Sequence, residues 1–146
     1  MSANGLATFD DTIQKTNIWL DDIMEELCWT HRESAYHALR AVLHTLRDRL
    51  PINESAQLAA QFPQLIRGMY YEGWQPNRTT VKERHWDQFV SHVSESFALD
   101  PEANGLEITK AVLGVLARHV SEGEIADVRH CLPADLRQHW NKRSSK

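Results

Sequence analysis

The chain has 146 residues, 42% of them hydrophobic and 25% charged, with a formal net charge of −4. This length suits one domain with a buried core, and the acidic balance excludes the basic surface that binding to nucleic acid requires. No apolar run approaches the roughly 20 residues of a membrane-spanning helix, and the first residues lack the pattern of a signal peptide, so we expect a cytoplasmic protein without a membrane or nucleic-acid partner.

Apolar residues spaced by three and four predict two long helices in the first third of the chain. The first is expected over about 10–29 and the second over about 32–50. The pattern Thr30-His-Arg-Glu33 predicts a capping box between them. Pro51 ends the second helix because proline disrupts a helix interior. The inward side of the second helix is expected to present Tyr36, Leu39, Leu43, Leu46 and Leu50.

Two shorter helices and a connection follow. The third helix is expected over about 53–61, and Pro63 opens a fourth that Gly73 ends. Residues 74–80 have turn chemistry but are too few and too aromatic for a flexible domain linker. The pattern Thr80-Val-Lys-Glu83 then predicts the cap of a fifth helix.

The second half of the chain continues in the same way. Asp100-Pro101-Glu102 predicts the start of another long helix, and Ser121-Glu-Gly-Glu124 predicts a capping box before a short helix over about 122–131. Pro133 opens the last helix. Alternating apolar segments of strand length are absent from the sequence. The sequence therefore predicts an all-α protein of about eight helices.

The two halves of the chain are related in sequence. An offset of 70 residues aligns 19–70 with 89–140 without a gap. About three identities would arise by chance, whereas the alignment contains these: Glu25/Glu95, Ala41/Ala111, Val42/Val112, Leu43/Leu113, Leu46/Leu116, Glu54/Glu124, Ala56/Ala126, Pro63/Pro133 and Arg67/Arg137. We therefore expect two tandem four-helix repeats, about 9–74 and 80–141, that share one core in a single domain over 1–146, with 142–146 as a disordered tail.

No pattern in the sequence predicts catalysis, a metal centre or a cofactor. The chain has eight histidines, but neither Glu-x-x-His nor His-Glu-x-x-His occurs. Cys28 and Cys131 are isolated and fit reduced, packed thiols. The pair Glu54 and Glu124 lies in predicted first helical turns, where a carboxylate has a sufficient structural role. Arg67 and Arg137 are expected to make buried or half-buried hydrogen bonds.

The segment from Arg67 to Trp74 is the most distinctive part of the first half. The alignment of the second half with the first ends at Trp140, so the segment that follows Tyr70 in the first half has no counterpart in the second. Tyr, Trp and Arg are enriched at the centres of protein interfaces, and we take Arg67, Tyr70, Tyr71 and Trp74 as candidate partner-binding residues. The alternative is that the aromatic side chains fill the seam between the repeats.

Three stretches of the sequence resemble a family. They are Ala38-Leu-Arg-Ala-Val-Leu-His-Thr-Leu-Arg-Asp-Arg-Leu-Pro51, Leu65-Ile-Arg-Gly-Met-Tyr-Tyr-Glu-Gly-Trp74 and Ser121-Glu-Gly-Glu-Ile-Ala-Asp-Val-Arg-His-Cys-Leu-Pro133. They resemble a bacterial family known only as domain of unknown function 2267, over about 9–140. The resemblance implies a small cytoplasmic helical protein, sometimes fused to or encoded beside stress-related and nucleotide-sensing modules. It implies no activity and no catalytic residues.

These observations favour a non-enzymatic helical module that binds another protein or a second copy of itself. The alternative is a protein that binds a small ligand or a metal ion in a pocket between the repeats. An enzyme whose site is assembled from distant residues is a third hypothesis, because such a site leaves no local motif.

Overall fold

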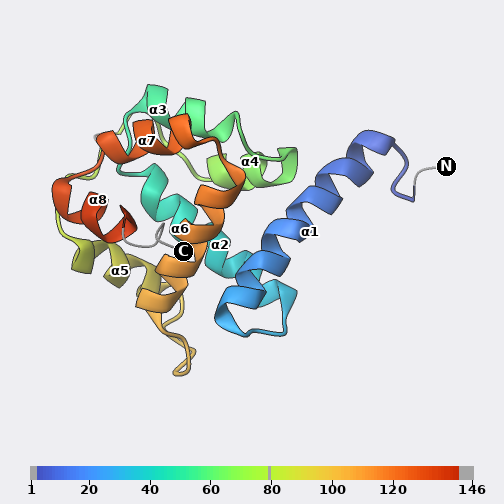
Figure 1. Cartoon of the computed structure of the whole chain (residues 1–146), viewed down its shortest axis with the longest axis horizontal. Coiled ribbons are helices and arrows are strands. Elements are labelled where there is room, and N and C mark those ends of the chain that lie inside the picture. The colour runs from blue at the N-terminus through green and yellow to red at the C-terminus, as the bar shows by residue number, and fades with distance from the viewer. Residues whose placement is uncertain (1–2, 79, 142–146) are drawn as a thin grey trace.

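A computed structural model describes residues 3–78 and 80–141, and this part of the chain forms eight helices and no strand. The predicted tail at 142–146 lies outside the described residues. The helices are α1 (Ala7–Leu27), α2 (Arg32–Arg47), α3 (Ile52–Ala59), α4 (Gln64–Tyr71), α5 (Trp86–Glu95), α6 (Gly105–His119), α7 (Glu122–His130) and α8 (Ala134–Asn141) (Figure 1). The all-α prediction is confirmed. No helix of this part of the chain is long and apolar enough to cross a bilayer.

Helices α2 and α6 lie at the centre of the molecule. They pack against each other, and each is also in contact with α1 and α5. Helix α4 covers α1 and α2, α8 covers α5 and α6, and α3 packs against α7. The N-terminal end of α1 projects from the body, while α3 and α7 lie at the end opposite the α5–α6 connection (Figure 1).

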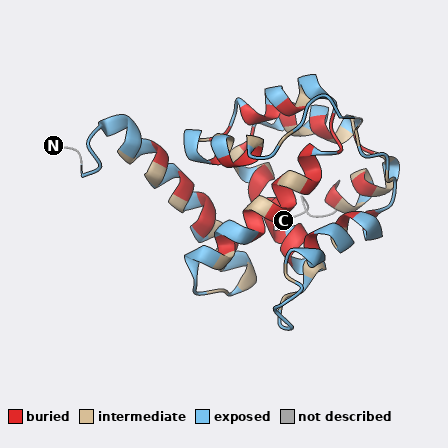
Figure 2. Cartoon of the chain, turned by 180° about the vertical axis from the view of Figure 1, so that it is seen from behind, coloured by how far each residue is buried: buried red, intermediate tan, exposed pale blue. Residues whose placement is uncertain are grey.

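The sequence explains why α2 and α6 are central. Leu39, Val42, Leu43 and Leu46 of α2 are fully buried, as their spacing predicts. Helix α6 has an almost unbroken run of buried residues from Ile108 to Leu116, which is the pattern of a helix covered on most sides. Buried residues accordingly concentrate in the middle of the molecule and exposed ones on the outer helix faces (Figure 2).

Two side chains differ from their predicted environment. Tyr36 was predicted to point inward but is 40% exposed, because it lies at the edge of the apolar side of α2. Cys28 was expected to be packed but is exposed. It ends α1 in a left-handed conformation with φ of 57°, and its backbone N–H bonds to the carbonyl of Glu25. The backbone of Cys28 therefore forms the C-terminal cap of α1.

Three predicted helix caps are wrong. The capping residue of α2 is His31, without a side-chain cap, in place of Thr30. Helix α6 begins after Asn104, whose Oδ1 accepts a bond of 3.1 Å from the N–H of Glu107, instead of at Asp100. Helix α5 begins after His85, well beyond Thr80. In each case several polar residues compete for the cap, and packing selects the one at the start of the buried stripe.

Loss of packing in the centre of the fold has a predictable cost. Leu43 is fully buried and Leu99 is 99% exposed, so the two leucines form a matched pair. We expect Leu43→Ala to lower the free energy of unfolding by about 2–5 kcal/mol and Leu99→Ala to change it by less than about 0.5 kcal/mol. Urea titration followed by circular dichroism measures both values. Equal effects of the two substitutions would contradict the assignment of α2 to the core.

Candidate functional site

Arg67, the first candidate partner-binding residue, is used inside the fold. Its Nε donates to the carbonyl of Ala59 at 3.1 Å and its Nη2 to that of Phe62 at 3.0 Å. Ala59 is the last residue of α3 and Phe62 lies in the turn that follows, a region where backbone carbonyls lack partners within a helix. Arg137 makes the corresponding bond of 2.8 Å to Leu132. The predicted half-buried hydrogen bonding of these two arginines is confirmed.

Tyr70, the second candidate, lies in the core. It is fully buried, and its hydroxyl donates to Ser55 Oγ at 3.1 Å. Its ring packs edge-on against Phe62, with 5.3 Å between the centroids, and burial raises the pKa of its hydroxyl. Tyr70 therefore holds α4 against α3, and its ring has no surface to offer a partner.

The end of α4 is fixed by two basic residues of α2. His44 Nε2 lies 2.7 Å from the carbonyl oxygen of Met69. The buried guanidinium of Arg47 donates through Nη1 to the carbonyls of Tyr70 at 2.9 Å and Glu72 at 2.8 Å. Basic groups complement the negative end of a helix and satisfy its free carbonyls. The chain that leaves α4 is thereby held in place.

Tyr71 and Trp74, the last two candidates, are half-buried and adjacent. Their ring centroids are 5.1 Å apart, and the intervening Gly73 makes the turn with a φ of 75°, a conformation that favours glycine. Trp74 lines a cavity of about 160 Å³ together with Ile52, Val81 and Arg78. Ile52 is 52% exposed and Val81 is 38% exposed, so apolar side chains in the wall of the cavity are open to solvent, beside the polar side chains of Asp48, Gln75 and Thr80. We call it the Trp74 cavity.

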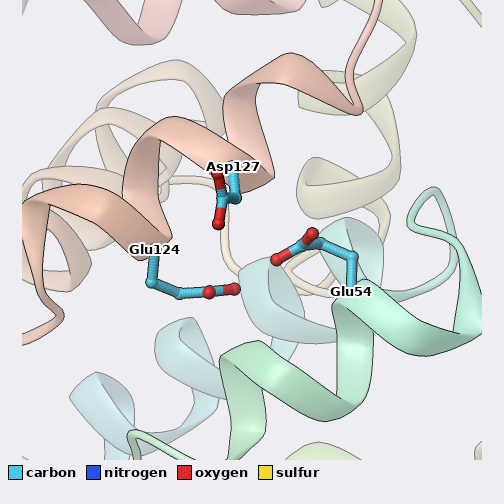
Figure 3. Close-up of side chains that lie close together, drawn as sticks. All are labelled: Glu54, Glu124 and Asp127. Atoms are coloured by element: carbon cyan, nitrogen blue, oxygen red, sulfur yellow. The ribbon is translucent and has the colours of Figure 1, made fainter.

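A second group of side chains lies where α3 meets α7. Glu54 of α3 and Glu124 and Asp127 of α7 direct their carboxylates to one point between the two helices (Figure 3). One oxygen from each lies within 4.8 Å of the other two. We call this the acidic cluster. Glu124 is buried, Glu54 is half-buried and Asp127 is exposed, so the cluster reaches from the interior to the surface.

The first turns of α3 and α7 explain why the two glutamates face each other. Each is the third residue of its helix, where a capping box would direct it back to the backbone N–H of the capping residue. In α3 that residue is Pro51, which has no N–H. In α7 it is Ser121, whose N–H bonds to Gln61 Oε1 at 2.9 Å. Ser121 Oγ does cap the N–H of Glu124 at 3.2 Å, so half of the predicted capping box is present.

The electrostatics of the acidic cluster are unfavourable for its charged state. Burial raises the pKa of Glu124, and the neighbouring carboxyl of Glu54 and the charge of Asp127 raise it further. Burial and the same acids raise the pKa of Cys131, whose Sγ lies 3.9 Å from Glu54 Oε1. None of the ion pairs formed within 3–78 and 80–141 involves these three acids.

Sequence reasoning missed the acidic cluster. It predicted no metal ligands and gave Glu54 and Glu124 only a helix-stabilising role. The sequence contained one indication of the cluster: Glu54 and Glu124 are identical residues at aligned positions of the two halves. They lie on helices that pack together in the structure. Carboxylate oxygens are the ligands that hard divalent cations prefer, so the three side chains have the composition of a cation site.

The burial of His44 between α2 and α4 predicts a pH effect on stability. Burial, followed by the charges of Arg47 and Arg40, lowers the pKa of His44 below 6.5. The unfolded chain therefore takes up a proton at position 44 more readily than the folded chain as the pH falls through that range. We expect the free energy of unfolding of the wild type, relative to His44→Gln, to decrease between about pH 7.5 and pH 5.5. Urea titrations across this range measure it, and parallel curves for the two proteins would contradict the burial of His44.

No curated protein matches the chain. A family model described as "Uncharacterized conserved protein (DUF2267)" matches residues 16–139, which include all four candidate partner-binding residues and the whole acidic cluster. The resemblance seen in the sequence is thereby confirmed, and the chain belongs to the DUF2267 family.

Proposed function

We propose that the chain is a non-enzymatic helical module that binds another protein, or a second copy of itself, at the Trp74 cavity. The observation that carries this proposal is the combination of Trp74, Ile52, Val81 and Arg78 around one open concave surface. Interface centres typically combine a large aromatic residue and arginine with apolar walls. The partner contributes an apolar side chain to the cavity and an acidic group to the exposed Arg78.

The surroundings of the cavity support this role. Tyr71 packs on Trp74, which limits the freedom that the Trp74 ring would lose on binding. Arg67 and Tyr70 support the cavity indirectly, because their hydrogen bonds inside the fold hold α4 to α3. Among the four candidates, Tyr71 and Trp74 are thus the ones that touch a partner, and the other two position them.

We also propose that the fold consists of two repeats, 9–74 and 80–141. The helix pairs support it: α1 contacts α6 as α5 contacts α2, and α3 contacts its counterpart α7. Val42 and Val112, which are aligned in the two halves, are both fully buried, in agreement with it. The Trp74 cavity is lined largely by the connection between the halves. A cytoplasmic location suits the free thiol of the exposed Cys28.

Site-specific crosslinking tests the interaction. A photoreactive amino acid at Ile52, on the wall of the cavity, is expected to crosslink a defined partner, or a second copy, in cells of the source organism. Trp74→Ala should reduce that crosslink at least about tenfold, because truncation of a central aromatic residue typically costs 2 kcal/mol or more of binding energy.

The control probe is placed at Leu99, which is 99% exposed and lies in the α5–α6 connection, away from α3 (Figure 1). Crosslinks from Leu99 should be insensitive to Trp74→Ala. The proposal fails if Ile52 yields no specific crosslink, or if Trp74→Ala leaves the crosslink unchanged while circular dichroism shows that the variant is folded. Sedimentation velocity distinguishes a second copy from a different protein.

A further inference from the structure

Glu124 distinguishes the acidic cluster from an ordinary group of surface acids. Only 7% of Glu124 is exposed, and its buried Oε2 has no hydrogen-bond donor. The buried Oε2 of Glu54 has none either. The Glu124 carboxylate points into the group, toward Glu54 (Figure 3). A buried carboxylate oxygen without a donor or counter-charge is strongly unfavourable, so this position requires a positive partner.

We propose that the carboxylates of Glu54, Glu124 and Asp127 bind a hard divalent cation that joins α3 to α7. All the candidate ligands are carboxylate oxygens, the ligand type that Ca²⁺, Mg²⁺ and Mn²⁺ share. The exposed position of Asp127 provides the opening through which a hydrated ion enters. Water completes the coordination on that side. This inference goes beyond the proposed interaction at the Trp74 cavity and does not depend on it.

The spacing of the oxygens favours the larger of these ions. The three ligand atoms lie within 4.8 Å of one another. Two ligands on opposite sides of Ca²⁺ are separated by about 4.6–5.2 Å, whereas opposite ligands of Mg²⁺ are only about 4.0–4.2 Å apart. A separation of up to 4.8 Å is closer to the geometry of Ca²⁺, so binding of Ca²⁺ requires a smaller movement of the three side chains than binding of Mg²⁺.

Cys131 argues against a soft metal at the same place. Soft metals prefer thiolate ligands, but Cys131 Sγ does not belong to the group of ligand atoms that lie within 4.8 Å of one another. Its S–H is directed to Glu54 Oε1 at 3.9 Å. None of the histidines in the described part of the chain belongs to the cluster. The cluster thus has the ligand set of an alkaline-earth site.

The N-terminal ends of two helices partly stabilise the carboxylates of the acidic cluster when no cation is bound. Glu54 and Glu124 lie in the first turns of α3 and α7, where the helix dipoles are positive and stabilise a carboxylate. That stabilisation is partial, because each helix end contributes only about half a unit charge. A divalent cation supplies the remainder, and its affinity falls as the pH is lowered because the ligands must be deprotonated.

Calorimetry and thermal unfolding of the full chain test the site. In chelator-treated protein at pH 8, Ca²⁺ should bind with one-to-one stoichiometry and raise Tm by about 4 °C or more at saturation. Mn²⁺ and Mg²⁺ serve as comparison ions, with Mg²⁺ expected to give the smaller shift. Lowering the pH to 6 should weaken the binding of Ca²⁺.

Three variants separate a specific site from general acidity. Glu124→Gln should raise Tm in chelator, because it removes a buried charge, and should abolish the Ca²⁺-induced shift. Asp127→Asn, at an exposed position, should leave the fold intact and weaken Ca²⁺ binding at least about tenfold. Glu122→Gln is the matched control: it is exposed and lies in the same first turn of α7, and it should bind Ca²⁺ like the wild type.

Several results would overturn the proposal. One is the absence of a Tm shift with all three cations in the wild type, which would mean that a proton shared between Glu54 and Glu124 is the only positive partner. Another is a Ca²⁺ shift that survives in Glu124→Gln. A third is an equal loss of binding in Glu122→Gln and Asp127→Asn, which would indicate diffuse attraction to an acidic surface.

Discussion

The fold depends on burial of the apolar faces of α2 and α6 against each other. Each of these helices is also covered by α1 and α5, so that Leu39, Val42 and Leu43 on one side and Ile108, Val112 and Leu116 on the other are removed from water. Burial of apolar surface stabilises a fold by about 25 cal/mol for each square ångström, so the packing of these four helices contributes strongly to the driving force for folding. The outer helices take their positions from it. Short helices such as α3, α4, α7 and α8 are too short to be stable alone, and they form because α2, α6 and one another provide surfaces for them.

That constraint explains the polar features at the ends of the short helices. Helix α4 has eight residues, and the carbonyls at its end find partners on α2, where Arg47 and His44 project from the core. Helices α3 and α7 lie side by side, with Gln61 after the end of α3 next to Ser121 at the start of α7 and Glu54 next to Cys131 at the end of α7. Pro51 and Gln61 remove the backbone partner that each third-position glutamate would otherwise use. Two glutamates with no capping role are thereby brought together in the interior, and the acidic cluster is a consequence of how the short helices are packed.

Much of the fold could be predicted from the sequence, and the site could not. The long helices follow from apolar spacing, and the breaks at Pro51, Gly73 and Pro133 follow from backbone chemistry. Caps were less predictable, because Thr30, Asp100 and Thr80 are good capping residues that lie a few residues before the start of the buried stripe. Tyr70 could not be assigned to the core from the sequence. Its burial depends on contacts with Ser55 and Phe62, which lie outside the helix that carries Tyr70. The acidic cluster needed the knowledge that α3 packs on α7, and pairing between helices is not encoded in local periodicity.

The two proposed sites share the first turn of α3. Ile52 forms a wall of the Trp74 cavity, and Glu54, two residues later, belongs to the acidic cluster. Helix α3 has only eight residues, and a helix of that length is held by its contacts more than by its own hydrogen bonds. A cation that fixes Glu54 to α7 therefore also fixes the backbone that carries Ile52. Thermodynamic linkage makes such an effect mutual: if the cation orders the cavity wall for a partner, the partner strengthens cation binding by the same factor. The helix that joins the two sites is thus the element through which binding at one would be transmitted to the other.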